Sequence, residues 1–141
     1  MQRGRRIAFD YGDARIGVAI SDPDSILSSP YITLKATDKN LFKSIVAIFD
    51  EIDPIQIFVG KPALLSGNTG SASAKAQEFA QKLAELTDVE IVMVDERMST
   101  VSAARNLREA GKNAKDSKAA IDMAAAVAIL EFGIELQKSG K

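Results

Sequence analysis

Three carboxylates lie where an apolar segment ends or is interrupted, and acidic residues at such positions are candidates for catalysis or metal binding. Asp10 ends the apolar run in IAFDYG, Glu96 follows another in MVDERMST, and Asp122 interrupts KAAIDMAAAVAIL. A carboxylate in such surroundings must find a partner or become neutral. Carboxylates that converge at one edge of a sheet are also how α/β proteins bind hard divalent cations. The pattern therefore favours metal-dependent chemistry on phosphates.

Two of these acids have structural explanations as well. Asp10, in an Asp-x-Gly sequence, is a good Asx-turn residue. Asp95 and Glu96 come together at the carboxyl end of a strand, where open parallel sheets bind ligands. Adjacent strand residues point to opposite faces, so we expect only one of this pair to enter a site. Asp95 alternatively serves a turn, or caps a helix that begins near Ser99 or Thr100.

Asp122 is the most informative of the three acids. The last helix is expected to be capped by Asp116 or Ser117, one turn before it. Asp122 would then lie inside the helix, on the same face as Ala125 and Ile129. A carboxylate on an apolar face needs a cation or several donors close by. The structural alternative is an ion pair with an arginine or a lysine.

The amino-acid composition limits the possible chemistry. The chain has no cysteine and no histidine, which excludes disulfides, thiol nucleophiles, Cys/His zinc sites and any Ser-His or Cys-His dyad. Carboxylates, lysines, hydroxyls or bound metals must carry any catalysis. The net charge of −1 provides no overall basic field, so binding of a polyanion requires a local patch.

Basic residues close to the acids provide a candidate for that patch. A series of them leads up to Asp122, and such spacing usually means a solvated helix face. Its closeness to an acidic site favours contact with a phosphate backbone. The candidate nucleic-acid-binding residues are Arg15, Arg97, Arg105, Arg108, Lys112, Lys115 and Lys118.

Hydrophobic periodicity predicts the elements that position these residues. Apolar runs at 6–9 and 15–21 predict a hairpin whose tight turn has a positive φ at Gly12. A short edge strand is expected at 31–34. The remaining pattern predicts helices at 40–52, 71–86, 101–110 and 118–137, and strands at 55–59 and 89–94. This order predicts an α/β fold with antiparallel strands first and parallel β-α-β units afterwards. The centre of the last helix is apolar almost all round, which predicts burial.

The length and hydropathy favour one compact cytoplasmic domain. The 141 residues suit a single domain covering 1–141, and 46% hydrophobic with 26% charged residues is an ordinary globular composition. No apolar stretch approaches the roughly 18 residues of a membrane span. The apolar run before Asp10 is too short for a signal-peptide core. We therefore expect no membrane partner.

Four blocks of the sequence together resemble the YqgF/RuvX family. They are FDYGDARIGVAISD, IFVGKPALLSG, VDERMSTVSAARNL and IDMAAAVAILEF, and they occur in order over nearly the whole chain. The resemblance implies a ribonuclease H-like fold, with a mixed central sheet and helices on both faces. It also implies a nuclease that matures the 5′ end of pre-16S ribosomal RNA during ribosome biogenesis, or a Holliday junction resolvase.

The resemblance further implies a catalytic acidic triad at Asp10, Glu96 and Asp122, with Asp95 as the second choice beside Glu96. These residues would hold one or two Mg²⁺ or Mn²⁺ ions, which can activate a water and stabilise the leaving oxygen of an in-line displacement. The implied partners are pre-16S rRNA or branched DNA, and ribosomal precursor particles. A resolvase would act as a homodimer, whereas a processing nuclease can be a monomer.

Two other functional classes fit the residues less well. An actin-like or sugar-kinase ATPase shares the strand-Asp-x-Gly start but needs two domains to enclose a nucleotide. A non-catalytic nucleic-acid-binding factor with the same fold would not need all three acids. The basic residues do not distinguish RNA from DNA, because contacts to phosphates carry no such information.

Overall fold

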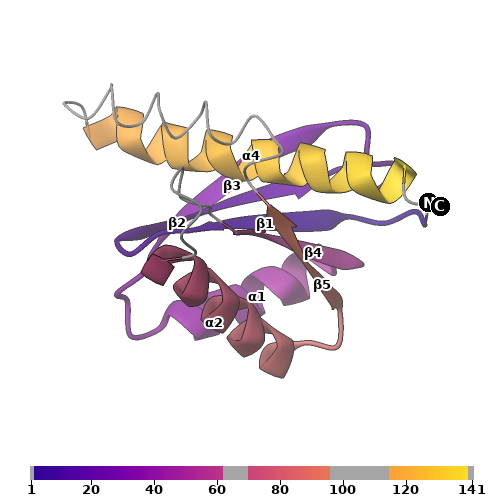
Figure 1. Cartoon of the computed structure of the whole chain (residues 1–141). Helices are drawn as coiled ribbons and strands as arrows, with labels where there is room; N and C mark the ends of the chain where they lie inside the picture. Colours follow the sequence, from indigo (N-terminus) through magenta and orange to yellow (C-terminus); the bar gives the residue numbers. More distant parts are fainter. Residues whose placement is uncertain (1, 62–69, 96–114, 140–141) are drawn as a thin grey trace.

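The computed structural model describes residues 2–61, 70–95 and 115–139, and the side chains at 2–61, 74–95 and 123–138. In this part of the chain, five strands form one sheet, and helices pack against it (Figure 1). The strands are β1 (Arg6–Tyr11), β2 (Arg15–Ser21), β3 (Ser28–Lys35), β4 (Gln56–Lys61) and β5 (Glu90–Asp95). The helices are α1 (Leu41–Ile52), α2 (Gly70–Leu86) and α4 (Lys115–Ser139).

The sheet is mixed, as the sequence predicts. Its strand order is β3-β2-β1-β4-β5. β2 runs antiparallel to both β1 and β3, whereas β1, β4 and β5 run parallel to one another. α1 precedes β4 and α2 precedes β5, so each parallel pairing has the helical crossover that it requires. The helix predicted at 101–110 lies outside the described residues.

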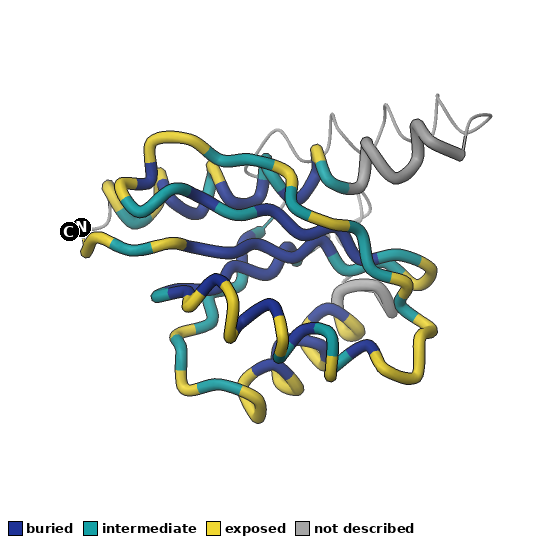
Figure 2. The backbone as a smooth tube through the Cα atoms, turned by 180° about the vertical axis from the view of Figure 1, so that it is seen from behind, coloured by how far each residue is buried: buried dark blue, intermediate teal, exposed yellow. Residues whose placement is uncertain are grey.

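Helices cover both faces of the sheet, which confirms the predicted layering. α1 and α2 lie on one face and α4 lies on the other (Figures 1 and 2). The central strand β1 contributes to both cores, because successive side chains point to opposite faces. Ile7 and Phe9 belong to the core under α1 and α2, and Ala8 belongs to the core under α4. We call these two sides the α1/α2 face and the α4 face.

The turn between β1 and β2 corrects one prediction. The hairpin forms, but the positive φ predicted at Gly12 is not present: among the described glycines, Gly4 is the one with a positive φ. A Cβ atom placed on Gly12 would lie 2.7 Å from the carbonyl oxygen of Arg15. Glycine is therefore needed here because the backbone approaches closely, not because of a left-handed conformation.

The described part of α4 begins at Lys115, three residues before its predicted start. Asp116 and Ser117 therefore lie inside the helix, and the prediction that one of them caps it is wrong. Asp122 lies seven residues beyond Lys115, about two turns into the helix. The correction places Asp122 deeper in the helix than the sequence indicated.

Burial along α4 is one-sided. In its apolar centre, Ala125, Ala126 and Ile129 are fully buried, whereas Ala124 is exposed and Val127 is half-buried. The all-round burial predicted from the apolar centre is therefore wrong, because small alanines carry that hydropathy on both sides of the helix. Within the described ranges, no helix has the length and apolar character that crossing a membrane would require.

Gly133 lets α4 approach the sheet closely. A Cβ atom at this position would lie 2.6 Å from Cδ1 of the Phe58 ring. Phe58 is on β4 and is fully buried, so its ring has little room to move away. A glycine in a helix interior costs about 1 kcal/mol relative to alanine, which the close packing on Phe58 offsets.

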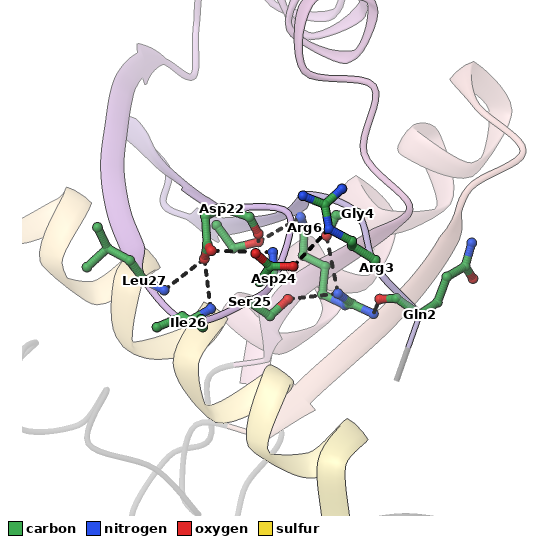
Figure 3. Close-up of polar contacts among 10 residues, drawn as sticks. Gln2, Arg3, Gly4, Arg6, Asp22, Asp24, Ser25, Ile26 and Leu27 are labelled. Atoms are coloured by element: carbon green, nitrogen blue, oxygen red, sulfur yellow. Dashed lines mark hydrogen bonds and ion pairs between the residues drawn. The ribbon is translucent and has the colours of Figure 1, made fainter.

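A buried arginine holds the end of the sheet where β1 begins (Figure 3). Arg6 is 3% exposed, and burial lowers the pKa of its guanidinium from the ordinary value. Nε donates to Oε1 of Gln56 at 2.9 Å, and Nη1 donates to Oγ of Ser25 at 2.8 Å. The backbone N–H of Arg6 donates to Oγ of Ser21 at 2.9 Å. These bonds join β1, β4 and the loop after β2.

Asp22 organises the loop between β2 and β3 at the same end. Its Oδ1 accepts hydrogen bonds from the backbone N–H groups of Ile26 at 2.7 Å and Leu27 at 2.8 Å (Figure 3). The bond from Leu27 lowers the pKa of Asp22 most, and those from Ile26 and Asp24 lower it further. The ionised carboxylate therefore stabilises this loop.

We predict that Gly133→Ala destabilises the protein by about 1–2 kcal/mol. Overpacking a core costs about 1–3 kcal/mol, and the better helix propensity of alanine returns part of this. Urea unfolding followed by circular dichroism measures the change, with Glu131→Ala on the exposed side of α4 as the control. The cost should be smaller in a Phe58→Leu background. A Gly133→Ala variant as stable as the wild type would contradict the close packing.

We predict that Asp22→Asn lowers the melting temperature at neutral pH, because the charged acceptor is lost. The folded-state pKa of Asp22 lies below the unfolded value of about 3.9, so its stabilisation is present above that value. It is lost as the pH falls through the folded pKa. The gap between wild type and variant should therefore close in acid. A gap that keeps its size across the acid range, or an equal effect of Asp50→Asn, would contradict this.

Candidate functional site

Asp10 lies near the carboxyl end of the central strand and is 2% exposed. Ala8 packs under α4, so the alternation along β1 places Asp10 on the α4 face as well. Its partner on β2 is Gly17. On β4 the last paired residue is Val59, opposite Phe9, and Gly60 follows it. Glycines thus occupy the positions on both sides of Asp10, and they bring no side chains beside this carboxylate.

Asp95 falls on the other face of the sheet. It ends β5 directly after Val94, which is fully buried in the core under α4. Met93, two residues before Asp95, packs against the core under α1 and α2. Asp95 therefore shares the α1/α2 face with Met93, and the pleat separates it from Asp10.

The backbone of Asp122 is part of α4, and its side chain is not among those that the structure describes. The residues three, four and seven positions further along are Ala125, Ala126 and Ile129, and all three are fully buried in the core under α4. Residues at this spacing share one face of a helix. The helical backbone thus puts position 122 on the same side of α4 as these buried residues, as the sequence predicted.

The structure describes the other predicted site residues to different extents. Lys115 and Lys118 are in α4, where the structure describes the backbone only. Several predicted residues lie outside the described residues: Glu96, Arg97, Arg105, Arg108 and Lys112. Their roles stay predictions.

Arg15 begins β2 at the same end of the sheet as Asp10 and is half-buried. Its neighbour in the strand, Ile16, lies in the core under α1 and α2, so Arg15 falls on the α4 face. It pairs with Lys35 at the end of β3, and Gly17 pairs with Thr33. The structure thus adds Thr33 and Lys35 to the surroundings of Asp10, and the sequence analysis missed both.

Lys35 was missed because the pairing of β2 with β3 shifts by one residue. Val18 pairs with Ile32, but the next residue, Ala19, pairs with Pro30, so Tyr31 is extra. A one-residue bulge of this kind exchanges the two faces of a strand beyond it. Alternation read from the sequence could not have placed Lys35 on the α4 face without knowledge of this bulge.

The turn between β1 and β2 contacts α2, on the α1/α2 face of the sheet. Lys75 of α2 donates from Nζ to Oδ1 of Asp13 at 3.0 Å, and this hydrogen bond is the main cause that raises the pKa of Lys75. Tyr11 lies against Phe79 of α2, with 5.0 Å between the ring centroids. These contacts fix the strand end that carries Asp10 to the layer beneath it.

The donor chemistry around Asp10 fits a hard divalent cation. A buried carboxylate supplies oxygen ligands of the type that Mg²⁺ and Mn²⁺ prefer, and its glycine neighbours leave the adjacent positions without side chains. Among the described side chains, no three acidic residues form a group that could hold a metal ion. Two of the three predicted acids, Glu96 and Asp122, have no described side chain.

Comparisons with known proteins agree on a family and a fold. A family model described as RuvX, Holliday junction resolvase, matches residues 4–135. A "Putative pre-16S rRNA nuclease" from Streptomyces avermitilis is 43% identical over 144 residues, which span 100% of this chain and 92% of the relative. A protein of the same name from Rhodococcus erythropolis is 44% identical over 135 residues, which span 92% of this chain and 76% of the relative.

Solved structures extend the agreement to the fold. RuvC from T. thermophilus, solved in complex with a Holliday junction, has a TM-score of 0.61 at 13% identity and covers 97% of this chain and 96% of its own. The structure of Thermus thermophilus RuvC alone has a TM-score of 0.57 at 14% identity, with 96% of each chain covered. At this identity the likeness concerns the fold alone, and it confirms the predicted ribonuclease H-like architecture.

Proposed function

The chain belongs to the RuvX family, and on that basis we propose that it is a metal-dependent nuclease that processes the 5′ end of pre-16S ribosomal RNA. As a member of this family, the chain is a nuclease, that is, an enzyme that hydrolyses phosphodiester bonds. The named substrate comes from relatives that share about two fifths of its residues over nearly the full length of this chain. In this role it would act in the cytoplasm as one domain, on ribosomal precursor particles.

The placement of Asp10 is the observation that supports this proposal most. It is a buried carboxylate on the central strand, held between two glycines and beneath the helix that carries Asp122. A rigid strand positions a catalytic group more accurately than a loop does. This rigid, buried position supports the proposal that Asp10 is the central catalytic acid.

The alternation along β5 favours Glu96 over Asp95 as its partner. Val92 and Val94 pack with the core under α4, the side on which Asp10 lies. The same alternation predicts Glu96 on that face and leaves Asp95 on the other. We therefore propose Asp10, Glu96 and Asp122 as the catalytic acids, and the three would reach one region from β1, the end of β5 and α4.

We propose that these three acids hold one or two Mg²⁺ or Mn²⁺ ions. When bound, such ions supply a water nucleophile at neutral pH and neutralise charge that develops on the phosphate. The chain's own contribution is to fix three carboxylates on separate elements. This assignment explains how a protein without histidine can hydrolyse a phosphodiester, because no side chain is then needed as the general base.

A Holliday junction resolvase is the second candidate, because the matching family model carries that description. Symmetric cleavage of a four-way junction needs two active sites, and therefore a dimer. The two candidates are separated by incubating the purified protein with labelled pre-16S RNA and with four-way DNA junctions, each with Mg²⁺ and with Mn²⁺. Sedimentation with and without the junction then shows whether a dimer forms. Cleavage of junctions by a dimer, with no cleavage of the RNA, would overturn the first proposal.

We predict that Asp10→Asn and Asp122→Asn each lower the rate of cleavage by more than about 100-fold while the fold stays intact. Residues that merely support metal ligands are worth about 10–100-fold, and a direct ligand should be worth more. Single-turnover cleavage measures the rate, and circular dichroism checks the fold. Asp50→Asn, an exposed residue of α1, is the matched control. Full activity in both site variants would rule out this assignment.

A further inference from the structure

We infer that Arg15 and Lys35 together bind the backbone of the nucleic acid next to Asp10, with Lys35 as a substrate-binding residue that no motif indicates. We call these two residues the cationic pair. The inference rests on the proposed nuclease function and adds to it a path for the substrate. That path crosses the end of the sheet from β3 through β2 to β1.

The strand register places the cationic pair beside Asp10. Asp10 pairs with Gly17, and Gly17 pairs with Thr33, which gives one row across three strands. Two residues nearer the end of the sheet, Arg15 pairs directly with Lys35. Arg15 is thus the diagonal neighbour of Asp10, at about 7–8 Å, which is within reach of a long side chain. Lys35 lies two strands away from β1, about 10 Å across the sheet.

All of these positions fall on one face of the sheet. Ile16 is in the core under α1 and α2, and Leu34 packs against that core. Their neighbours in the strands, Arg15 and Lys35, therefore fall on the α4 face with Asp10. Lys35 is exposed and Arg15 is half-buried, so the pair can meet a ligand without unfolding of the strand ends.

The charges of the cationic pair favour an anionic ligand. Arg15 and Lys35 lie directly opposite each other on antiparallel strands, and both side chains are basic. Guanidinium and ammonium groups are the usual side-chain donors to phosphate oxygens. A phosphate bound at this place would lie within reach of both groups.

The surface at the cationic pair is also hollowed. A cavity of about 420 Å³ is bordered by Ala14, Arg15, Thr33, Leu34 and Lys35. The N–H of Ala36 donates to the carbonyl oxygen of Ala14 at 2.9 Å, which ties the two strand ends together at the border of the hollow. The size is that of a small-ligand pocket, and a sugar-phosphate segment fits its charge and its open shape.

The resulting path gives each residue a separate role. The phosphate to be cleaved lies at Asp10, and phosphates further along the same strand lie at Arg15 and then at Lys35. Contacts to phosphates position a nucleic acid without reading its sequence. The cationic pair would thus set which phosphate reaches Asp10, and it would act equally on RNA and DNA.

Salt dependence of binding tests this proposal without relying on cleavage. The affinity of an Asp10→Asn protein for a labelled pre-16S RNA fragment is measured against KCl concentration with Mg²⁺ present, and Lys35→Ala is added to this background. Loss of one phosphate contact weakens binding similarly for all sequences and reduces the slope of log K against log salt by about 1. We expect this result for Lys35→Ala and a reduction of about 2 when Arg15→Ala is added.

Lys43→Ala is the matched control, because it removes the same charge from an exposed position on α1, at the other face of the sheet. We expect it to leave the slope unchanged. In the active protein, Lys35→Ala should raise KM with little change in kcat, because the contact is made before and during reaction alike. A Lys35→Ala protein whose slope and KM match those of Lys43→Ala would overturn the proposal.

The two proposals fail in different ways. If the wild type cleaves neither RNA nor junctions, the proposed function is wrong, while the salt dependence still tests the cationic pair. If cleavage occurs and the slope is unchanged in Lys35→Ala, the path across β3 is wrong and the nuclease function stands. An absence of binding to any tested nucleic acid would contradict both.

Discussion

The pleat of the central strand β1 is the constraint on which the rest of the structure depends. Ile7 and Phe9 turn to α1 and α2, and Ala8 turns to α4, so burial on both faces fixes the register of β1. A slip of one residue would exchange the two sets of side chains, and the bulky Phe9 would then meet the face where the small Ala8 now lies under α4. The same alternation decides where Asp10 lies, so the packing of the core and the position of the candidate catalytic acid have one cause.

The position of α4 follows from the same face of the sheet. Phe58 and Val94 provide its floor, and Gly133 lets the helix come close to the Phe58 ring. Asp122 lies on the same helix, about three turns before Gly133. Close packing at one end of the helix thus orients the helix that carries an acid at the other. Gly133 is far from the candidate site, and yet it helps to orient the helix that carries one of the proposed catalytic acids.

The sequence predicted the elements because their periodicities are strong. Alternation and helical spacing predicted the described strands and helices in the right order. The pleat places Asp95 on the face away from Asp10, whereas Glu96 lies outside the described residues. The start of α4 was misplaced because Asp116 and Ser117 have good capping chemistry but lie inside the helix. Lys35 was missed because its face depends on the extra residue Tyr31 between two register pairs. Such a bulge is a property of the pairing of two strands and leaves no pattern in either strand alone.

Asp10 is proposed to bind the catalytic metal on the α4 face of the sheet. The most direct measurement is a crystal structure grown with Mn²⁺, with the ion located by its anomalous scattering. We expect a Mn²⁺ ion bound directly to the carboxylate of Asp10, and its loss in Asp10→Asn crystals. An ion bound at Asp95 on the opposite face, with Asp10 making no contact to any metal, would overturn the assignment of Asp10.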